Sequence, residues 1–237
     1  MTTPLYREDA YLQETMGQVA QVTEQGVILD RALFYPHGGG QPGDRGRLLW
    51  DGGDMAVADT RKGEDGAIVL IPAPGAALPE QGAQVSQHLD WDLRHAHMRM
   101  HTALHLLSVV IPLPVSGGSI GAEKSRLDFD MPDAPEDKSA IEAALNALIA
   151  RDLDVTESWI TDAELDANPG LVKTMSVSPP RGSGRIRLVR IGQGTEQVDL
   201  QPCGGTHVAR TGEIGPIELG KIEKKGARNR RVYIRLA

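Results

Sequence analysis

The sequence predicts an α+β protein, with a small N-terminal β-barrel followed by a two-layer domain in which a sheet packs on long helices. Short β-prone runs separated by Gly and Pro turns fill the first ninety residues. Residues 91–111 contain neither Gly nor Pro, as expected for a long helix. The later strands do not alternate one for one with helices, which favours α+β over a regular parallel α/β sheet. We therefore expect domains at residues 1–89 and 90–237.

The barrel strands are predicted from runs of β-forming residues that follow one another at regular spacing. Turn residues separate them, as at Gly52-Gly53 and in the segment 72–75. The runs cover residues 18–22, 26–30, 47–50, 56–58, 67–71 and 84–89. Many short strands joined by tight turns are typical of a small closed barrel.

Two helices are predicted in the second domain. Asp90 is suited to cap the first, whose apolar residues recur at steps of three and four, and Pro112 ends it, so one face should pack on a core. The second is expected at residues 136–152. Strands are expected at residues 155–160, 185–191, 197–200, 217–222 and 231–236, and a mobile loop at the Ser-, Pro- and Gly-rich residues 176–184.

Composition narrows the class of protein. A chain of 237 residues can bury a full core without disulfides or metal staples. Cys203 is the only cysteine, so no internal disulfide can form, and a reducing compartment is indicated. No run approaches the roughly 18 apolar residues of a membrane span, and acidic residues precede any apolar stretch at the N-terminus, unlike in a secretory signal. We expect a cytoplasmic protein.

The charge of the chain is unevenly distributed. The formal net charge is −7, which argues weakly against a nucleic-acid partner. The segment 221–237 nevertheless holds seven basic residues and one acidic residue. Such an asymmetry is a candidate footprint for phosphate, although a solvated pair of C-terminal strands explains it equally well.

Two pairs of side chains carry the candidate chemistry. His101 and His105 are four residues apart, so they lie on one face of the predicted helix at a spacing that suits two bonds to one metal ion. Cys203 and His207 flank two glycines that let the backbone turn, so that thiolate and imidazole can converge. A mixed Cys and His set suits zinc. On spacing alone, His97 with His101 is as good a helix pair as His101 with His105.

Two other interpretations of these residues are weaker. A helical metalloprotease motif needs Glu after its first histidine, and Thr102 occupies that position. A Cys203 nucleophile with a His207 base stays open, but it leaves His101 and His105 without a role. The separation of 98 residues between His105 and Cys203 favours a functional site assembled by the fold over a small structural zinc knuckle.

At these pairs the sequence resembles a known family. The segments 101–107 (HTALHLL) and 203–208 (CGGTHV) are similar to the paired motifs of alanyl-tRNA synthetase editing domains and of their free-standing relatives, the AlaX proteins. Related pairs occur in the editing domain of bacterial-type threonyl-tRNA synthetase. The segment 34–46 (FYPHGGGQPGDRG) resembles the glycine-rich barrel motif of the medium-length AlaX type. Residues 118–129, 211–215 and 226–231 resemble further signatures of the family. The similar segments follow the family's order and spacing over most of the chain.

The resemblance implies a stand-alone editing protein without a synthetase catalytic core. It also implies that His97 is not a zinc ligand. The implied zinc ligands are His101, His105, Cys203 and His207, and Cys203 with His207 also forms the metal-assisted catalytic pair, with no separate general base. The resemblance also implies that the barrel brings its backbone close to the terminal adenosine of the tRNA at Gly38, Gly39, Gly40 and Gln41. Two departures concern side-chain discrimination: Leu104 stands where a polar residue is common, and no Gln precedes Gly118-Ser119.

The expected function is hydrolysis of mischarged tRNA(Ala), namely Ser-tRNA(Ala) and also Gly-tRNA(Ala), and which of the two is the main substrate stays open. The hydroxyls of Thr102, Ser116 and Ser119 are candidates to read the serine side chain, and the amides of Gly204 and Gly205 to stabilise an oxyanion. The residues expected to meet tRNA phosphate are Lys221, Lys224, Lys225, Arg228, Arg230 and Arg231, joined by Arg185 and Arg187. Two alternatives stay open: a zinc-stabilised tRNA-binding module without catalysis, and editing of Ser-tRNA(Thr). Neither a membrane nor an obligatory protein partner is expected.

Overall fold

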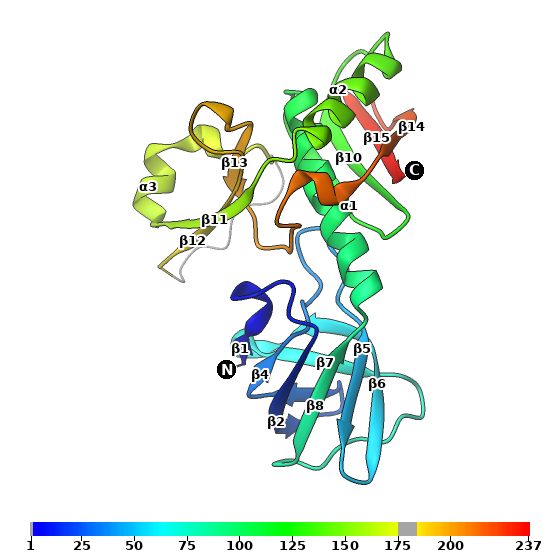
Figure 1. Ribbon diagram of the computed structural model, residues 1–237, viewed down its shortest axis with the longest axis vertical. Coiled ribbons are helices and arrows are strands. Elements are labelled where there is room, and N and C mark those ends of the chain that lie inside the picture. Colours follow the sequence, from blue (N-terminus) through cyan, green and yellow to red (C-terminus); the bar gives the residue numbers. More distant parts are fainter. Residues whose placement is uncertain (1, 175–183) are drawn as a thin grey trace. The chain divides into compact units, whose positions relative to one another are not determined.

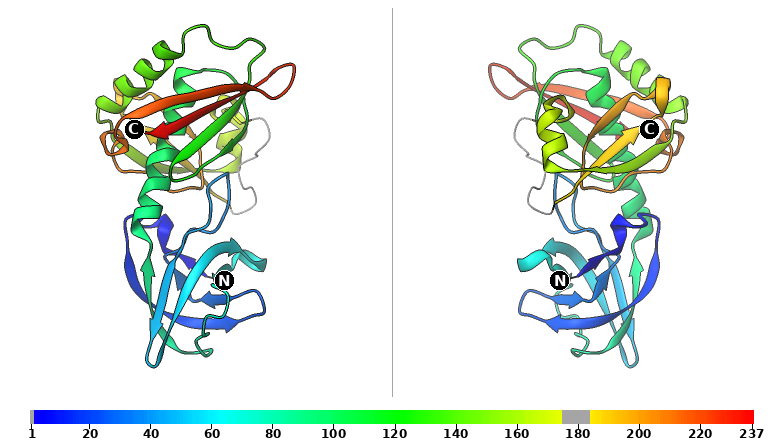
Figure 2. Two further views of the ribbon diagram at one scale, coloured as in Figure 1. Left: turned by 90° about the vertical axis from the view of Figure 1, so that its right-hand side faces the viewer. Right: turned by 90° about the vertical axis from the view of Figure 1, so that its left-hand side faces the viewer.

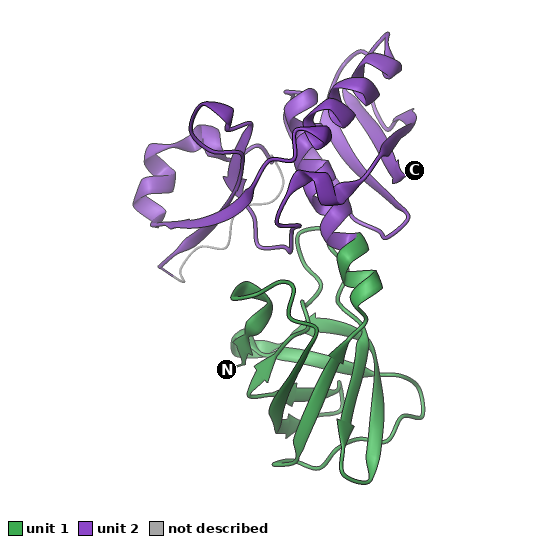
Figure 3. Ribbon diagram, in the orientation of Figure 1, with its two compact units in different colours: residues 1–96 green, residues 97–237 purple. Residues whose placement is uncertain are grey.

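The structure, a computed structural model, describes residues 2–174 and 184–237. It divides into two compact units, Met1–Ala96 and His97–Ala237, which are described separately below (Figure 3). The predicted loop at residues 176–184 lies outside the described residues, apart from Gly184. The predicted domain boundary at residue 90 precedes the first long helix, and the division between the units falls within that helix.

Unit 1 is a closed antiparallel barrel (Figure 1). Its strands close in the order β2-β3-β7-β6-β5-β8, and each predicted run of β-forming residues falls on one of them, which confirms the barrel. The strands are β2 (Glu14–Val22), β3 (Val27–Leu29), β5 (Gly46–Trp50), β6 (Gly53–Lys62), β7 (Ile68–Pro72) and β8 (Gln84–Leu89). Outside the barrel, β1 (Thr3–Pro4) pairs in parallel with β4 (Arg31–Ala32), and short 3₁₀ helices cover Leu5–Arg7 and Glu64–Gly66.

The barrel interior is filled by alternate side chains of its strands. In β6, Met55 and Val57 point inward, and a β-bulge between Val57 and Asp59 then shifts the inward face to Thr60. The apolar core also contains Leu29, Phe34, Leu48, Leu70 and Val85, which are almost fully buried. Together they supply the burial that stabilises a small barrel without any cross-link.

The long helix α1 (Trp91–Val110) begins and ends where the sequence predicts. The Asp90 carboxylate accepts a hydrogen bond from the Leu93 N–H at 3.2 Å, as an N-cap does. The expectation of one apolar face is wrong, however, because residues 100–108 are buried all round the helix. The cause is its place in unit 2, where α1 runs between two sheets (Figure 2).

The described residues of unit 2 form two antiparallel sheets instead of the single sheet expected. The large sheet has the order β14-β15-β10-β9 and the small sheet the order β11-β12-β13. The large sheet is built from β9 (Val115–Ser119), β10 (Lys124–Asp130), β14 (Ile217–Lys224) and β15 (Asn229–Leu236). The small sheet is built from β11 (Val155–Ile160), β12 (Ile186–Ile191) and β13 (Asp199–Pro202). The mixed α+β class is confirmed.

Helix α2 (Lys138–Ala150) covers the outer edge of the large sheet. Asn146 on α2 exchanges two hydrogen bonds with the backbone of Ile217, and Glu142 accepts from the N–H of Leu219. These side chains satisfy backbone groups that an edge strand leaves without a neighbour. Unit 2 also contains α3 (Asp162–Ala167) and 3₁₀ helices at Pro169–Leu171, Gly194–Glu196 and Thr211–Ile214.

Strands β9 and β10 and helix α3 were not expected from the sequence. In β10 the side chains of Ser125, Leu127 and Phe129 are buried, while charged residues alternate with them. Asp128 is paired with Arg126 and with Arg231 of β15, and the pair with Arg231, which is distant in sequence, keeps this charge on the strand. Within the described part of the chain, no helix is long and apolar enough to cross a membrane.

Candidate metal centre

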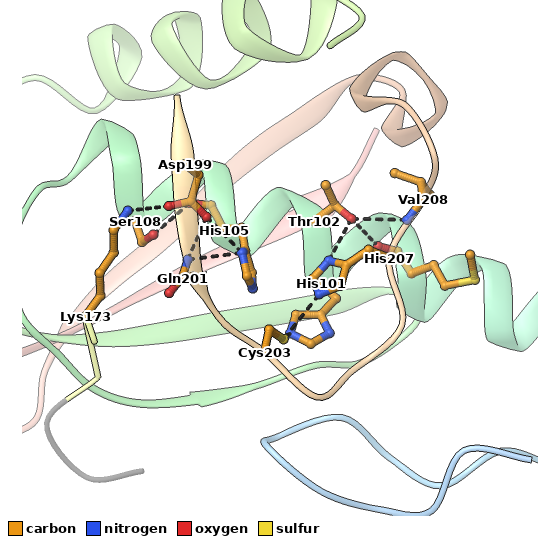
Figure 4. A network of polar contacts seen from close by, with 11 residues as sticks. His101, Thr102, His105, Ser108, Lys173, Asp199, Gln201, Cys203, His207 and Val208 are labelled. Atoms are coloured by element: carbon orange, nitrogen blue, oxygen red, sulfur yellow. Dashed lines mark hydrogen bonds and ion pairs between the residues drawn. The ribbon is translucent and has the colours of Figure 1, made fainter. Parts of the chain in front are cut away.

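Four side chains converge in unit 2. His101 and His105 come from adjacent turns of α1, and Cys203 and His207 come from the segment that follows β13 (Figure 4). Their potential ligand atoms all lie within 4.8 Å of one another. Cys203 Sγ is 3.4 Å from His101 Nε2 and 3.2 Å from His207 Nε2. The structure therefore brings together the helix pair and the loop pair, with His105 and not His97 in the cluster.

The loop from Cys203 to His207 does not turn by the means expected. Neither Gly204 nor Gly205 has a positive φ, so glycine's freedom in the left-handed region is not what bends the chain. Arg187 of β12 holds the loop: its Nη1 donates to the carbonyls of Cys203 and Gly205, each at 2.8 Å. The Cys203 N–H in turn donates to the Arg187 carbonyl at 3.1 Å.

Thr102 fixes the tautomer of His207. Its hydroxyl donates its single proton to the carbonyl of Met98 at 3.0 Å, so it accepts from His207 Nδ1 at 3.1 Å and from the Val208 N–H at 3.3 Å. His207 therefore carries its proton on Nδ1 and turns the lone pair of Nε2 toward Cys203. Thr102 is also fully buried. The expectation that this hydroxyl reads the substrate serine does not fit, because its bonding capacity is used.

Asp199 plays the same part for His105. Its buried carboxylate accepts a hydrogen bond from His105 Nδ1 at 3.0 Å. This leaves the lone pair of Nε2 as the one that the ring can offer to a metal ion. The carboxylate also accepts from Gln201 Nε2 at 2.8 Å and from Lys173 Nζ at 2.5 Å. No local pattern indicates this network, because Lys173 and Asp199 are 26 residues apart and meet only when the chain is folded.

The electrostatics of the cluster favour a thiolate. Burial disfavours the charged thiolate, but the charge of His101 and of His207 lowers the pKa of Cys203 well below its usual value. Burial, followed by the charge on His101, lowers the pKa of His207. Burial also opposes a charged His105, yet its hydrogen bonds with Asp199 and Cys203 raise its pKa to about 9. The pKa of Asp199 falls to about 2, because His105 and Lys173 outweigh the effect of burial.

The donor set fits a zinc ion. Structural and catalytic zinc ions are commonly bound by thiolate and neutral imidazole ligands, with four ligands in all. In such sites the other ring nitrogen of each imidazole usually donates a hydrogen bond to a protein group. His105 has its Nδ1 on Asp199 and His207 has its Nδ1 on Thr102, so each presents Nε2 to the cluster. The raised pKa favours a second proton on the His105 ring, and a metal ion would displace that proton from Nε2, as ligation requires.

The other predicted substrate residues are distributed along the large sheet and the barrel. The Ser116 hydroxyl donates to the Asp128 carbonyl at 3.1 Å and accepts from Asn229 Nδ2 at 2.9 Å, so it holds strands together. Ser119 lies at the end of the edge strand β9, opposite Arg126. Of these hydroxyls, Ser119 is the one that the structure leaves as a candidate for reading serine.

The glycine-rich segment of unit 1 forms a tight turn. Gly38 and Gln41 exchange both backbone hydrogen bonds at 3.0 Å, and Gly39 and Gly40 between them have φ values of 59° and 83°. Two positive φ values are typical of a type I′ turn, which Gly adopts without strain. Gly39 is exposed, whereas Gln41 is fully buried. The glycines thus present backbone at the surface, and the Gln41 side chain does not.

The predicted basic cluster is largely paired within unit 2. Arg230 is buried and donates to the carbonyls of Gly226, Asn229 and Pro132, so it does not fit a contact with phosphate. Arg187 is likewise committed to the Cys203 loop. Four further ion pairs join Lys221 and Lys225 to Glu223, Arg228 to Asp130 and Arg231 to Asp128. The positive charge counted along the sequence is therefore reduced by acidic residues of neighbouring strands.

Comparison with known proteins gives the class of protein first. Residues 186–233, which include the Cys203 loop, match the model of the threonyl and alanyl tRNA synthetase second additional domain. Residues 8–93, which form the barrel of unit 1, match the model of class II (A) tRNA synthetases. The fold and the cluster thus define a protein of the editing-domain class.

Relatives along the whole chain then give the family. The chain is 36% identical to the alanyl-tRNA editing protein AlaX-M of Methanosarcina acetivorans, over all of this chain and 99% of the relative. It is 33% identical to AlaX-M of Saccharolobus solfataricus, over 98% of each chain. It is also 37% identical to the alanine–tRNA ligase of Pyrobaculum calidifontis, over 94% of this chain but 25% of the ligase. The chain belongs to the AlaX-M family.

Proposed function

We propose that the protein is a zinc-dependent trans-editing hydrolase that deacylates mischarged tRNA(Ala), with Ser-tRNA(Ala) as its main substrate and Gly-tRNA(Ala) as a second one. The observation that carries the proposal is the convergence of His101, His105, Cys203 and His207 within 4.8 Å, in a chain that matches AlaX-M proteins from end to end. A cytoplasmic location follows from a tRNA substrate.

The cluster would hold the metal through three imidazoles and one thiolate. When bound, zinc supplies a positive charge that can orient water and polarise an ester carbonyl. Thr102 and Asp199 keep the lone pairs of His207 and His105 directed at the metal. Because the side chains that orient the ligands are buried, the site is preorganised and loses little entropy when substrate arrives.

The reaction is hydrolysis of the ester that joins the amino acid to the terminal ribose. The oxygen of water adds to the ester carbonyl carbon, and the electron pair of the carbonyl moves to its oxygen. Collapse of this tetrahedral species restores the carbonyl and breaks the bond to the ribose oxygen, which takes up, as it leaves, the proton that the attacking water gives up. We propose that the backbone N–H of Gly204, an exposed residue, donates to the oxyanion.

Discrimination against alanine requires a polar group that pairs with the serine hydroxyl and loses its partner when alanine is bound. Ser119 is the predicted hydroxyl that fits this part, since Thr102 and Ser116 are engaged within the protein. Gly-tRNA(Ala) is proposed as a second substrate on the family resemblance alone, because glycine, like alanine, has no hydroxyl to pair with this group.

Binding of tRNA is proposed for the surface formed by β14, β15 and the turn between them. Lys221, Lys224 and Lys225 extend from this hairpin, with Arg228 and Arg231 nearby. Such a surface contacts phosphate without reading sequence, so binding should weaken as salt rises. In unit 1, the glycine turn Gly38–Gly40, in which Gly39 is exposed, is proposed to approach the terminal adenosine.

Deacylation assays test the proposed function directly. The substrates are Ser-, Gly- and Ala-tRNA(Ala) and Ser-tRNA(Thr), and zinc content is measured on the same samples. We expect hydrolysis of Ser-tRNA(Ala) and Gly-tRNA(Ala) and protection of Ala-tRNA(Ala). Cys203→Ala and His105→Ala should each lower the rate by about 10³-fold or more, since each removes a ligand. His88→Ala, a histidine of the barrel, is the matched control and should keep the wild-type rate.

The same assays separate the alternatives. A protein that carries stoichiometric zinc but hydrolyses none of the charged tRNAs would be a zinc-stabilised RNA-binding module, and the enzyme proposal would then be abandoned. Because the matched domain model covers threonyl as well as alanyl synthetases, a preference for Ser-tRNA(Thr) would move the proposal to that tRNA.

A further inference from the structure

Arg187 is a buried charged residue with no place in the proposed chemistry so far. It lies in the middle of the small sheet, on β12, and is 8% exposed. Its guanidinium uses Nη1 for two backbone carbonyls, those of Cys203 and Gly205, both at 2.8 Å. A buried cation bonded to the loop that carries the thiolate is expensive to desolvate, so its retention calls for an explanation.

Glu157 on the neighbouring strand β11 completes this arrangement. Arg187 Nε donates to Glu157 Oε2 at 2.7 Å, and Nη2 donates to the other carboxylate oxygen. The contact is bidentate, which fixes the plane and the direction of the guanidinium. Arg187 therefore has a rigid support on one side and the Cys203 loop on the other. A lysine at this position could not make both sets of contacts, because it has a single nitrogen.

Holding the carbonyls determines where the amides of the loop point. The peptide bonds of the described residues are trans, and in a planar trans peptide the N–H points opposite to the C=O. Because the Cys203 carbonyl faces Arg187, the N–H of Gly204 faces away from it. Gly204 is exposed, and a Cβ placed there would meet no atom within 4 Å. Its N–H donates no backbone hydrogen bond within the described part of the chain, and it points away from Arg187.

We propose that Arg187, braced by Glu157, is a positioning residue that fixes the Cys203–Gly205 backbone so that the Gly204 N–H is aimed at the developing oxyanion of the ester. This inference rests on the proposed function for its substrate. It differs from a purely structural role, because Arg187 grips the peptide whose amide would touch the reacting oxygen, next to the thiolate ligand. A group aimed before the reaction lowers the barrier without reorganisation.

The variants Arg187→Gln, Arg187→Lys and Glu157→Gln test the proposal, with Arg190→Gln as the matched control on the same strand. Arg190 contacts Gln197 and not the loop. For Arg187→Gln we expect kcat on Ser-tRNA(Ala) to fall by about 30- to 100-fold with KM within about twofold, because a misdirected oxyanion donor acts on the transition state. Arg187→Lys and Glu157→Gln should lie between this value and wild type, and zinc content should stay stoichiometric in all four.

A second readout does not depend on activity. With cobalt(II) in place of zinc, the sulfur-to-metal charge-transfer band reports the geometry at Cys203. The band should shift in Arg187→Gln and stay unchanged in Arg190→Gln. Wild-type kcat together with a wild-type band in Arg187→Gln would overturn the proposal, as would a fall in kcat that only follows loss of zinc. Should the wild-type protein hydrolyse no charged tRNA, the proposed function fails, and the cobalt band still decides whether Arg187 positions Cys203.

Discussion

The buried network of charged groups around Arg94 in unit 1 and the network around Cys203 in unit 2 are built differently. In unit 1, Arg94 and Asp44 are 0% and 1% exposed. Arg94 donates to both carboxylate oxygens of Asp44 and to the carbonyls of Ala10 and Leu33, each at 2.9 Å. Asp44 also accepts from the Tyr35 N–H. Every charged group in this network is paired within the barrel.

The network of unit 2 is directed toward a common point instead. His105 and His207 each give one ring nitrogen to a protein group, Asp199 or Thr102, and turn the other toward Cys203. The ring nitrogens and the Cys203 sulfur that converge there carry lone pairs that can bind a cation. Burial of charge alone therefore does not mark a site: the closed network of Arg94 stabilises a fold, whereas the convergent network around Cys203 still has lone pairs that can bind a cation.

The largest effect is expected when the closed network is broken. Arg94→Met leaves the carboxylate of Asp44 buried without its cation, which should lower the free energy of unfolding by about 3–5 kcal/mol. Urea denaturation measures this, and Arg45→Met, an exposed neighbour in sequence, is the control. The folded fraction should bind zinc as tightly as wild type, because the ligands lie in unit 2. A loss of stability equal to that of Arg45→Met would show that the pair contributes nothing.

A smaller effect on stability but a specific effect on the metal is expected for Asp199→Asn. The change keeps the shape of the side chain and removes the charge that orients His105 and holds Lys173. Zinc affinity should fall by about 10- to 100-fold, measured by competition with a chromophoric chelator. Asp133→Asn, at an exposed position, should leave the affinity unchanged. Wild-type affinity in Asp199→Asn would mean that His105 does not need this partner.

Thr102→Val should weaken zinc binding by about tenfold, because the Nδ1–H of His207 and the N–H of Val208 lose their acceptor. The ratio of rates on Ser-tRNA(Ala) and Ala-tRNA(Ala) should not change. Thr102→Ser keeps the hydroxyl and serves as the control. A collapse of that ratio in Thr102→Val alone would restore Thr102 as the residue that reads serine.

Local pattern predicted the parts of the molecule that local physics determines. The barrel strands, the N-cap Asp90 and the stop at Pro112 follow from propensity and turn residues. The spacing of His101 and His105 places both on one helix face, and the structure shows their ring centroids 5.3 Å apart. The spacing could not choose between His97 and His105, because that choice depends on which turn of α1 faces the Cys203 loop.

The parts that sequence reasoning missed depend on contacts between distant segments. Asp199, Lys173 and Arg187 carry no local pattern that links them to the ligands, and the Cys203 loop bends through Arg187 and not through its glycines. The charge count of the C-terminal segment misled for the same reason, because Asp128 and Asp130 come from another strand. To predict these contacts from sequence, one would have had to know which strands pair and which distant segments meet.

The smallest expected effect tests what remains of that basic surface. Lys224 has no ion-pair partner among residues 2–174 and 184–237 of the structure, whereas Arg231 is paired with Asp128 at 2.8 Å. Lys224→Gln should therefore lower the slope of log affinity for tRNA against log salt by about 1. Arg231→Gln should lower it by less, because that cation is already neutralised by a carboxylate before tRNA binds. Equal slopes for Lys224→Gln and wild type would move the tRNA surface away from the β14–β15 hairpin.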